Sequence, residues 1–261
     1  MSIFRLLFSR RYWWQTLIVL LAMAVMAGLG QWQLARLDQR RAANADLLVK
    51  LQSDPLVVTG ADLPESPDAL EDRLAEVTGT YDFARQIAVQ GQFFEEAPGY
   101  WLVTPLQIEG STSAILVNRG WIPAAAGEGG EWSAFNETPD QPVRGYLQRS
   151  RKMPDGSTSV VPADVVKGWW RVDIEAIQSQ MPYPLLPVVL QVAPDESRGR
   201  DELPRRVAVD FDLSEGSHMI YAIQWYAFAL IAGTVYLVLL RRRETGATDG
   251  KLDADAAEKE D

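Results

Sequence analysis

The chain has 261 residues, 47% of them hydrophobic, which allows one folded body with membrane segments but not two large independent domains. Its 25 basic and 35 acidic side chains give a formal net charge of -10, which repels phosphate backbones and argues against nucleic acid as a partner. With no cysteine and one histidine, the sequence excludes disulfides, Cys/His zinc sites, thiol nucleophiles and a covalently attached c-type haem.

The first predicted element is a transmembrane helix at residues 12–30, which follows a short cytoplasmic N-terminus at residues 1–11. The run is almost entirely apolar, and about 19 residues rising ~1.5 Å each reach close to ~30 Å, the thickness of a bilayer core. Leucines continue at roughly helical intervals through residues 31–51, until Asp54 and Pro55 break the pattern. A helical stalk is therefore expected to extend the span.

The same N-terminus has an alternative interpretation as a removed signal peptide. Residues 22–24 (Ala-Met-Ala) resemble a cleavage site, and residues 9–11 (Ser-Arg-Arg) resemble a twin-arginine signal. Cleavage there would cut through one continuous helical pattern, so the retained span is the preferred reading. The leader also lacks the Ser/Arg-rich amphipathic stretch of an organelle transit peptide, which points to a bacterial cytoplasmic membrane.

Residues 31–218 are predicted to form an extracytoplasmic domain with the stalk at its start. They carry 28 acidic and 17 basic side chains, a net charge of about -11, as suits a soluble domain. Beyond the stalk the hydrophobic period falls towards two, and short segments rich in β-branched and aromatic residues alternate with turn formers. The candidate strands are residues 74–81, 86–90, 100–108, 113–123, 143–148, 169–173 and 188–192. The candidate short helices are residues 67–73 and 173–180, and residues 124–140 form a loop by composition.

A second apolar run at residues 219–240 predicts a second transmembrane helix. Residues 241–261 follow as a disordered cytoplasmic tail, since they contain too few apolar residues to fold. The expected fold class is therefore α+β. A β-rich, mainly antiparallel domain, either a sheet or a small barrel, lies between two transmembrane helices.

The orientation follows from the basic residues beside the spans. Arg5, Arg10 and Arg11 precede the first span and residues 241–243, all arginine, follow the second, which places both termini in the cytoplasm. Arg36, Arg40 and Arg41 beyond the first span are a counter-signal, but long loops translocate largely regardless of charge. The expected product is a multi-pass membrane protein, N-in and C-in, with the central domain outside the cytoplasm.

Two aromatic motifs in the central domain allow two interpretations each. In residues 118–123, Arg119 could meet a partner's carboxylate and Trp121 an apolar face, forming a docking corner. Local chemistry favours the plainer alternative, a turn that ends a strand with Trp121 in the core. Trp169 and Trp170 are adjacent on a candidate strand, so one ring must point away from the core, to cover another element or to face a partner.

His218 immediately precedes the second span. Ala222 and Trp225 follow it at i+4 and i+7 on the same helical face. A neutral imidazole can ligate haem iron, the small Ala222 would admit the edge of a macrocycle, and Trp225 could stack against it. The alternative is an ordinary interfacial histidine beside an aromatic belt, and local chemistry alone favours that alternative.

Taken together, these residues resemble the surfeit-locus-one family of cytochrome c oxidase assembly factors. The resemblance covers nearly the whole chain, apart from its two ends and the loop at residues 124–140. Each matching segment is weak evidence by itself, but the order of the segments between two apolar spans is specific. They are residues 30–37 (GQWQLARL), 79–81 (GTY), 105–106 (PL), 117–123 (VNRGWIP), 170–173 (WRVD) and 218–226 (HMIYAIQWY).

The resemblance implies a non-enzymatic assembly factor that works where haem a is delivered to the catalytic subunit of the oxidase. In bacterial relatives the histidine that begins the second span is associated with haem a, so His218 inherits the role of iron ligand. The contribution of Trp225 is inferred from helical geometry, and no chemical role transfers onto Arg119 or Trp121. The implied partners are the oxidase catalytic subunit, haem a synthesis proteins and the lipid bilayer.

The sequence leaves two other classes of function open. One is a two-span scaffold or resident oxidase partner that binds no cofactor. The other is an enzyme, which the sequence disfavours because Ser217, beside His218 in the chain, is poorly placed to act as its nucleophile and no G-x-S-x-G motif is present.

Overall fold

The computed structural model describes residues 7–60, 63–139, 142–161, 166–195, 198–199 and 201–257, with side chains described as far as residue 243. The chain divides into two compact units. One combines Met1–Ala45 with Leu213–Asp261, and the other is Asp46–Asp212. Most of the predicted stalk therefore belongs to the same unit as the second apolar helix.

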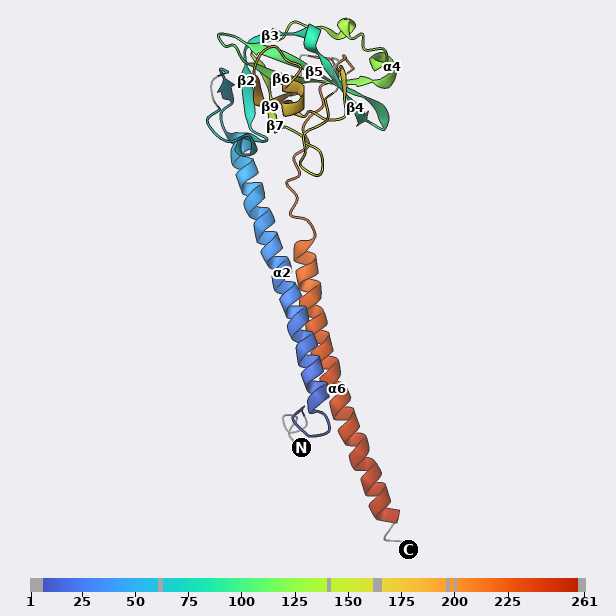
Figure 1. Cartoon of the computed structure of the whole chain (residues 1–261). Coiled ribbons are helices and arrows are strands. Elements are labelled where there is room, and N and C mark those ends of the chain that lie inside the picture. Colours follow the sequence, from blue (N-terminus) through green and yellow to red (C-terminus); the bar gives the residue numbers. More distant parts are fainter. Residues whose placement is uncertain are drawn as a thin grey trace. The chain divides into compact units, whose positions relative to one another are not determined.

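Two long helices account for most of the first unit: α2 (Trp13–Gln52), whose last turns, from Asp46, are assigned to the second unit, and α6 (His218–Ala257). Both are long and apolar enough to cross a membrane, and most of their large apolar side chains are exposed, unlike those of a soluble core helix. They lie side by side, in blue and in orange to red in Figure 1. The contact is close where residues are small, since a Cβ on Gly30 would come within 2.9 Å of the Tyr226 ring.

Helix α2 confirms that the first apolar run continues without a break into the predicted helical stalk, and it ends at Gln52, just before Asp54 and Pro55. Helix α6 differs from the prediction, because it continues to Ala257 through residues expected to form a disordered tail. Residues 241–257 include three arginines and four alanines, which are strong helix formers. Once the apolar segment has nucleated a helix, such residues extend it without burial in a core.

Among its described residues, the second unit has nine strands and three short helices. The strands are β1 (Leu56–Val58), β2 (Leu74–Val77), β3 (Gly79–Tyr81), β4 (Ile87–Phe94), β5 (Ala97–Ile108), β6 (Ala114–Pro123), β7 (Val143–Arg149), β8 (Gly168–Trp169) and β9 (Leu185–Val192). The helices are α3 (Pro67–Leu70), α4 (Ala124–Gly127) and α5 (Ile174–Gln178), and the single 3-10 turns are η1 (Phe83–Arg85) and η2 (Ser133–Phe135).

A partner switch within residues 74–81 closes part of this sheet into a barrel. The first half of the segment, β2, pairs with β7, whereas the second half, β3, pairs with β5. Strands β7, β9, β6 and β5 are neighbours in that order, so the segment joins the two ends of the series. The result is a ring of five strands, extended beyond β5 by β4 and β8.

Five of the eight strand pairings are antiparallel, and the parallel ones are β1 with β2, β4 with β8 and β6 with β9. The predicted α+β fold with a mainly antiparallel, β-rich domain is confirmed. The sequence left open whether the strands form an open sheet or a small barrel. The ring of strands shows that part of the sheet closes into a barrel.

Alternating side chains on β6 explain why the barrel wall is apolar on both faces. Ile115 and Val117 join a buried cluster to which all the ring strands contribute, and this cluster fills the barrel. Leu116, on the opposite face, joins a second cluster with Trp169 and with Ile177 of α5. The short helix α5 therefore covers the outside of the barrel wall.

Two local predictions need correction. The predicted strand at residues 169–173 is limited to Gly168–Trp169, because Asp173 turns the chain into α5 as its N-cap, accepting from the backbone N–H of Ala176. The predicted loop at residues 124–140 contains α4 and η2, although residue 140 itself lies outside the described part of the chain.

Candidate functional site

The candidate ligand His218 lies at the first residue of α6, as predicted. Its Nδ1 is 2.8 Å from Oε1 of Gln33 on α2. An amide oxygen only accepts hydrogen bonds, so Nδ1 is the donor in this contact, which leaves the lone pair of the neutral imidazole on Nε2. The described residues provide no hydrogen-bond donor to Nε2, and the ring is only partly buried.

The segment before α6 is tied to α2 by several polar contacts. Asn44 donates from Nδ2 to the carbonyl of Leu213 at 2.7 Å, and Arg40 donates from Nε to the carbonyl of Ser214 at 3.0 Å. Arg41 forms a two-pronged pair with Glu215, with Nε 2.8 Å from Oε1. That hydrogen-bonded pairing with Arg41 lowers the pKa of the Glu215 carboxyl. These contacts fix the point at which α6 starts, and therefore the height of the histidine beside α2.

Gly216 leaves one edge of the imidazole ring uncovered. It adopts a φ of 67°, a conformation that favours glycine, and an added Cβ would lie 3.6 Å from Cδ2 and 3.7 Å from Nε2 of His218. The chain thus passes the Nε2 side of the ring without a side chain at that position. An imidazole with a proton on Nδ1 and an uncovered lone pair on Nε2 fits the donor chemistry of an axial haem ligand.

The two residues predicted to accompany His218 are placed differently. Ala222 is 1% exposed, so its surface is already covered within the helix pair and does not receive the edge of a macrocycle. Trp225 is half-buried, and its ring packs edge-on against Phe228 with centroids 6.0 Å apart. Trp225 lies two helical turns, about 10 Å, along α6 from His218, and its stacking against a macrocycle stays a prediction.

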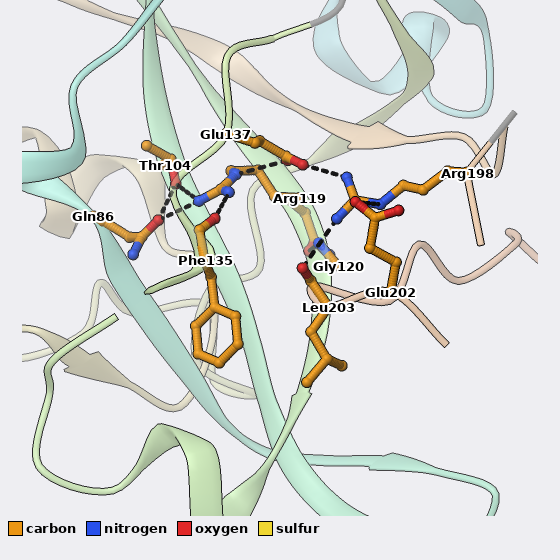
Figure 2. Close-up of polar contacts among 10 residues, drawn as sticks. Gln86, Thr104, Arg119, Gly120, Phe135, Glu137, Arg198, Glu202 and Leu203 are labelled. Atoms are coloured by element: carbon orange, nitrogen blue, oxygen red, sulfur yellow. Dashed lines mark hydrogen bonds and ion pairs between the residues drawn. The ribbon is translucent and has the colours of Figure 1, made fainter. Parts of the chain in front are cut away.

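Arg119 forms a second polar cluster, inside the globular unit (Figure 2). Leu102 pairs with Gly120 and Val103 with Asn118, so Arg119 is the extra residue of a β-bulge in β6. Gly120, with a φ of 136°, allows the backbone of Arg205 to approach so closely that a Cβ would lie 2.4 Å from its carbonyl oxygen. The bulge and this close approach explain the local sequence Asn-Arg-Gly.

The Arg119 guanidinium is fully buried and is satisfied within the chain. It donates from Nε to Glu137 at 3.1 Å, from Nη1 to Gln86 at 2.6 Å, and from Nη2 to the carbonyl of Phe135. Its central carbon also lies 5.3 Å from the ring centroid of Tyr81. Burial lowers the pKa of Arg119, and the negative charge of Glu137 opposes that shift. Arginine is not deprotonated in proteins, so the buried guanidinium keeps its positive charge.

Glu137 extends the cluster to a second arginine. Its other carboxylate oxygen accepts from Arg198, which also pairs with Glu202 at 3.3 Å and donates to the carbonyl of Leu203 at 3.1 Å (Figure 2). One carboxylate therefore joins the segment that follows η2 to the segment that follows β9.

The predicted docking corner at Arg119 and Trp121 is not formed. Arg119 does meet a carboxylate, but it is that of Glu137 in the same chain, and Trp121 is only 6% exposed with its ring against Phe94. The plainer interpretation, with Trp121 in the core, describes the structure. At the other motif Trp169, at the end of β8, is buried, and Trp170, just beyond the strand, is 71% exposed, so one of the two rings points away from the core.

Sequence reasoning missed Gln33, Gln86, Glu137 and Arg198. Gln33 could have been noticed, because an amide at the end of an apolar run tends to face another helix. Glu137 carries no such signal, since it lies in a loop-like stretch and its partners are remote in the chain. Within the described ranges, the structure has no group of three or more His, Asp or Glu side chains placed to hold a metal ion.

Comparison with known proteins agrees with the resemblance read from the sequence. The model of the SURF1 family matches residues 20–230. A "SURF1-like protein" of Monosiga brevicollis is 25% identical over 233 residues, which are 84% of this chain and 84% of the relative. "Surfeit locus protein 1" of Arabidopsis thaliana is 26% identical over 168 residues, 60% of this chain and 44% of the relative. A "SURF1-like protein" of Rickettsia felis is 24% identical over 230 residues, 86% of this chain and 96% of the relative. Because the family match extends from α2 through the globular unit into α6, the chain belongs to the SURF1 family.

Proposed function

We propose that this protein is an assembly factor for haem-copper cytochrome c oxidase, and that it holds haem a through His218 for delivery to the catalytic subunit. Membership of the SURF1 family is consistent with the assembly role. The observation that carries the haem proposal is the uncovered Nε2 of His218, at the start of an apolar helix and beside Gly216. Haem a is the cargo, and its iron supplies a position for an imidazole nitrogen.

A single imidazole suits a protein that must release its cargo. The chain has one histidine and no cysteine, so it offers neither a second imidazole ligand nor a thioether attachment. A ligand of this kind supports moderate, reversible binding. We assign the protein no catalytic role, and its function then rests on holding and positioning.

The proposed orientation places both termini in the cytoplasm and the globular unit outside. Basic residues lie before the first apolar run and after the second, and Arg41, which argues against this orientation, is paired with Glu215. The natural chain lacks cysteine, which makes single-cysteine labelling clean. In intact cells a membrane-impermeant maleimide should modify a Ser217→Cys variant but not a Ser9→Cys variant. The reverse pattern would place His218 on the cytoplasmic side and end the delivery proposal.

The haem proposal is tested on the purified full-length protein in detergent micelles. Titration with haem a should shift the Soret absorption of the wild type, and His218→Ala should abolish the shift. Gln224→Ala is a suitable control, because Gln224 lies on α6 and is exposed. Equal haem a binding by wild type and His218→Ala would remove the ligand assignment.

A cofactor-free scaffold is the second candidate function. The observation that favours it is Ala222, since the helical face expected to receive the macrocycle is packed within the helix pair. Both functions predict co-purification with the oxidase. The isolated chain separates them: a chain that stays colourless after haem a is added, yet still binds the oxidase, identifies the scaffold.

A further inference from the structure

We propose that Gln33 is a positioning residue for His218, which fixes the imidazole with its proton on Nδ1 and its lone pair on Nε2. The inference rests on the proposed role of His218 as a haem ligand. It adds a residue of α2 to a site that would otherwise consist of α6 alone.

The geometry makes Gln33 the second contributor to the site. Its Oε1 is 2.8 Å from Nδ1 of His218, and its side chain is half-buried, in contrast to the exposed Gln31 two residues earlier. Gly30, one turn before Gln33, has no side chain to hold Tyr226 away, so the helices approach closely just below the contact. On the C-terminal side of Gln33 along α2, the Arg41–Glu215 pair holds the segment that precedes α6. Gln33 thus lies between two points where α2 and α6 are held together.

The contact has a direct consequence for the ring. A neutral imidazole carries its proton on either nitrogen, and the hydrogen bond made by one nitrogen decides which one is left with the lone pair. Histidines that ligate metals usually donate their other N–H to an oxygen acceptor, and loss of that acceptor typically weakens metal binding by about 10- to 100-fold. Without Gln33, the ring of His218 is free to rotate and to exchange tautomers.

The first test reads the tautomer without any haem. Because the chain has one histidine, labelling with 15N-histidine gives signals from His218 alone in the full-length protein. At alkaline pH the wild type should show a protonated Nδ1 and an unprotonated Nε2. Gln33→Leu should shift the signals towards a mixture of tautomers. A wild type that carries its proton on Nε2 would overturn the proposal.

The second test measures haem a affinity with a matched control. Gln33→Leu should weaken binding about 10-fold or more, whereas Gln31→Leu, the same change on the same helix at a residue that contacts Tyr226, should bind as the wild type does. Gln33→Glu keeps an oxygen acceptor and should restore both the Nδ1–H tautomer and the affinity. A general loss of helix packing would not produce this rescue.

The outcomes separate the two proposals. If His218→Ala retains haem a, the ligand assignment fails whatever Gln33 does. If His218→Ala loses haem a while Gln33→Leu and Gln31→Leu bind equally well, the ligand stands and the positioning role of Gln33 is wrong. Weak binding by Gln33→Glu together with Gln33→Leu also contradicts the role as an oxygen acceptor.

Discussion

The hydroxyl of Tyr236 on α6 lies 2.6 Å from the hydroxyl of Thr16 on α2. Thr16 also lies 2.8 Å from the carbonyl of Leu7, to which its own proton goes, so Tyr236 is the donor in the bond between the helices. Counting about 1.5 Å per residue, this contact lies roughly 25 Å along α2 from Gln33, the residue bonded to His218. Two hydrogen bonds between the helices therefore bracket a length close to the hydrocarbon thickness of a bilayer.

Removal of the Tyr236 hydroxyl should weaken the helix pair. A hydrogen bond between helices in a membrane contributes about 0.6 kcal/mol on average, with a maximum near ~1.7, so Tyr236→Phe should lower the free energy of unfolding by that order. The measurement is denaturation of the full chain in mixed micelles by increasing amounts of SDS. Tyr221→Phe is the control, since its ring is 48% exposed. Equal destabilisation by both variants would contradict the importance of the bond.

Replacement of the buried Arg119 should destabilise the globular unit strongly. Arg119→Met leaves the Phe135 carbonyl without its donor, removes one of the two donors to Gln86 and leaves Glu137 with Arg198 alone. Loss of one partner from a buried ion pair costs about 3–5 kcal/mol. The comparison is Arg144→Met, because the side chain of Arg144 is 57% exposed and its pairing with Glu76 is worth about 0–1 kcal/mol. Urea unfolding followed by near-UV circular dichroism should therefore show a much lower midpoint for Arg119→Met than for Arg144→Met.

Substitutions in the turn between β4 and β5 should raise the free energy of unfolding, in contrast to the loss expected for Arg119→Met. Its two central residues, Glu95 and Glu96, have φ values of 47° and 67°, where glycine and asparagine are favoured. Left-handed backbone at residues of this type is strained by about 1 kcal/mol each. The double variant Glu95→Asn, Glu96→Gly should therefore stabilise the domain by about 1–2 kcal/mol.

A charge effect in the same turn is tested by Glu95→Gln with Glu96→Gln, which removes both carboxylates but keeps the unfavourable backbone. Comparable stabilisation by the two double variants would mean that repulsion between carboxylates, rather than backbone conformation, is what the substitutions relieve.

Tyr183 should make stability fall at alkaline pH. Partial burial, together with donation of its hydroxyl to Asp82 at 2.8 Å, raises the pKa of Tyr183 above its ordinary value near 10. The folded domain keeps this tyrosine protonated where the unfolded chain ionises it, so its contribution is present below pH ~10 and is lost as pH rises towards the folded pKa.

In Tyr183→Phe that part of the pH dependence should disappear. The free energy of unfolding measured in urea between pH 9 and about 11 should fall less steeply for the variant than for the wild type. At neutral pH the variant should be less stable, since it lacks the bond to Asp82, by about 1 kcal/mol. Parallel curves for the two proteins would show that Tyr183 ionises equally in both states.

The features predicted correctly from sequence depend on local pattern. Residues 12–51 read as one helix because an apolar run passes into a leucine repeat without a break, and α2 follows that pattern to Gln52. Most strands were recognisable by their period of two, and β6 and β7 differ from their predicted bounds by one residue or less. His218 was placed at the first residue of α6 because the apolar run starts immediately after it.

The features that were missed depend on partners remote in the chain. Nothing in residues 74–81 indicates that the two halves pair with different strands, because the alternation of side chains is the same throughout. The pairing of Arg119 with Glu137 could not be foreseen, because Glu137 lies in a loop-like stretch 18 residues further along the chain. The buried surface of Ala222 is likewise decided by α2, which no pattern within α6 reveals.

The partner switch within residues 74–81 also constrains biosynthesis. That segment leaves the ribosome early, yet one half must wait for β7, and the ring is incomplete until β9, the last strand before α6, has been made. A topology dominated by such distant pairings folds slowly and exposes apolar strand surface while it waits. The nascent chain is therefore expected to keep apolar strand surface exposed until β9 has been made, and a truncation before β9 is expected to aggregate rather than yield a smaller stable domain.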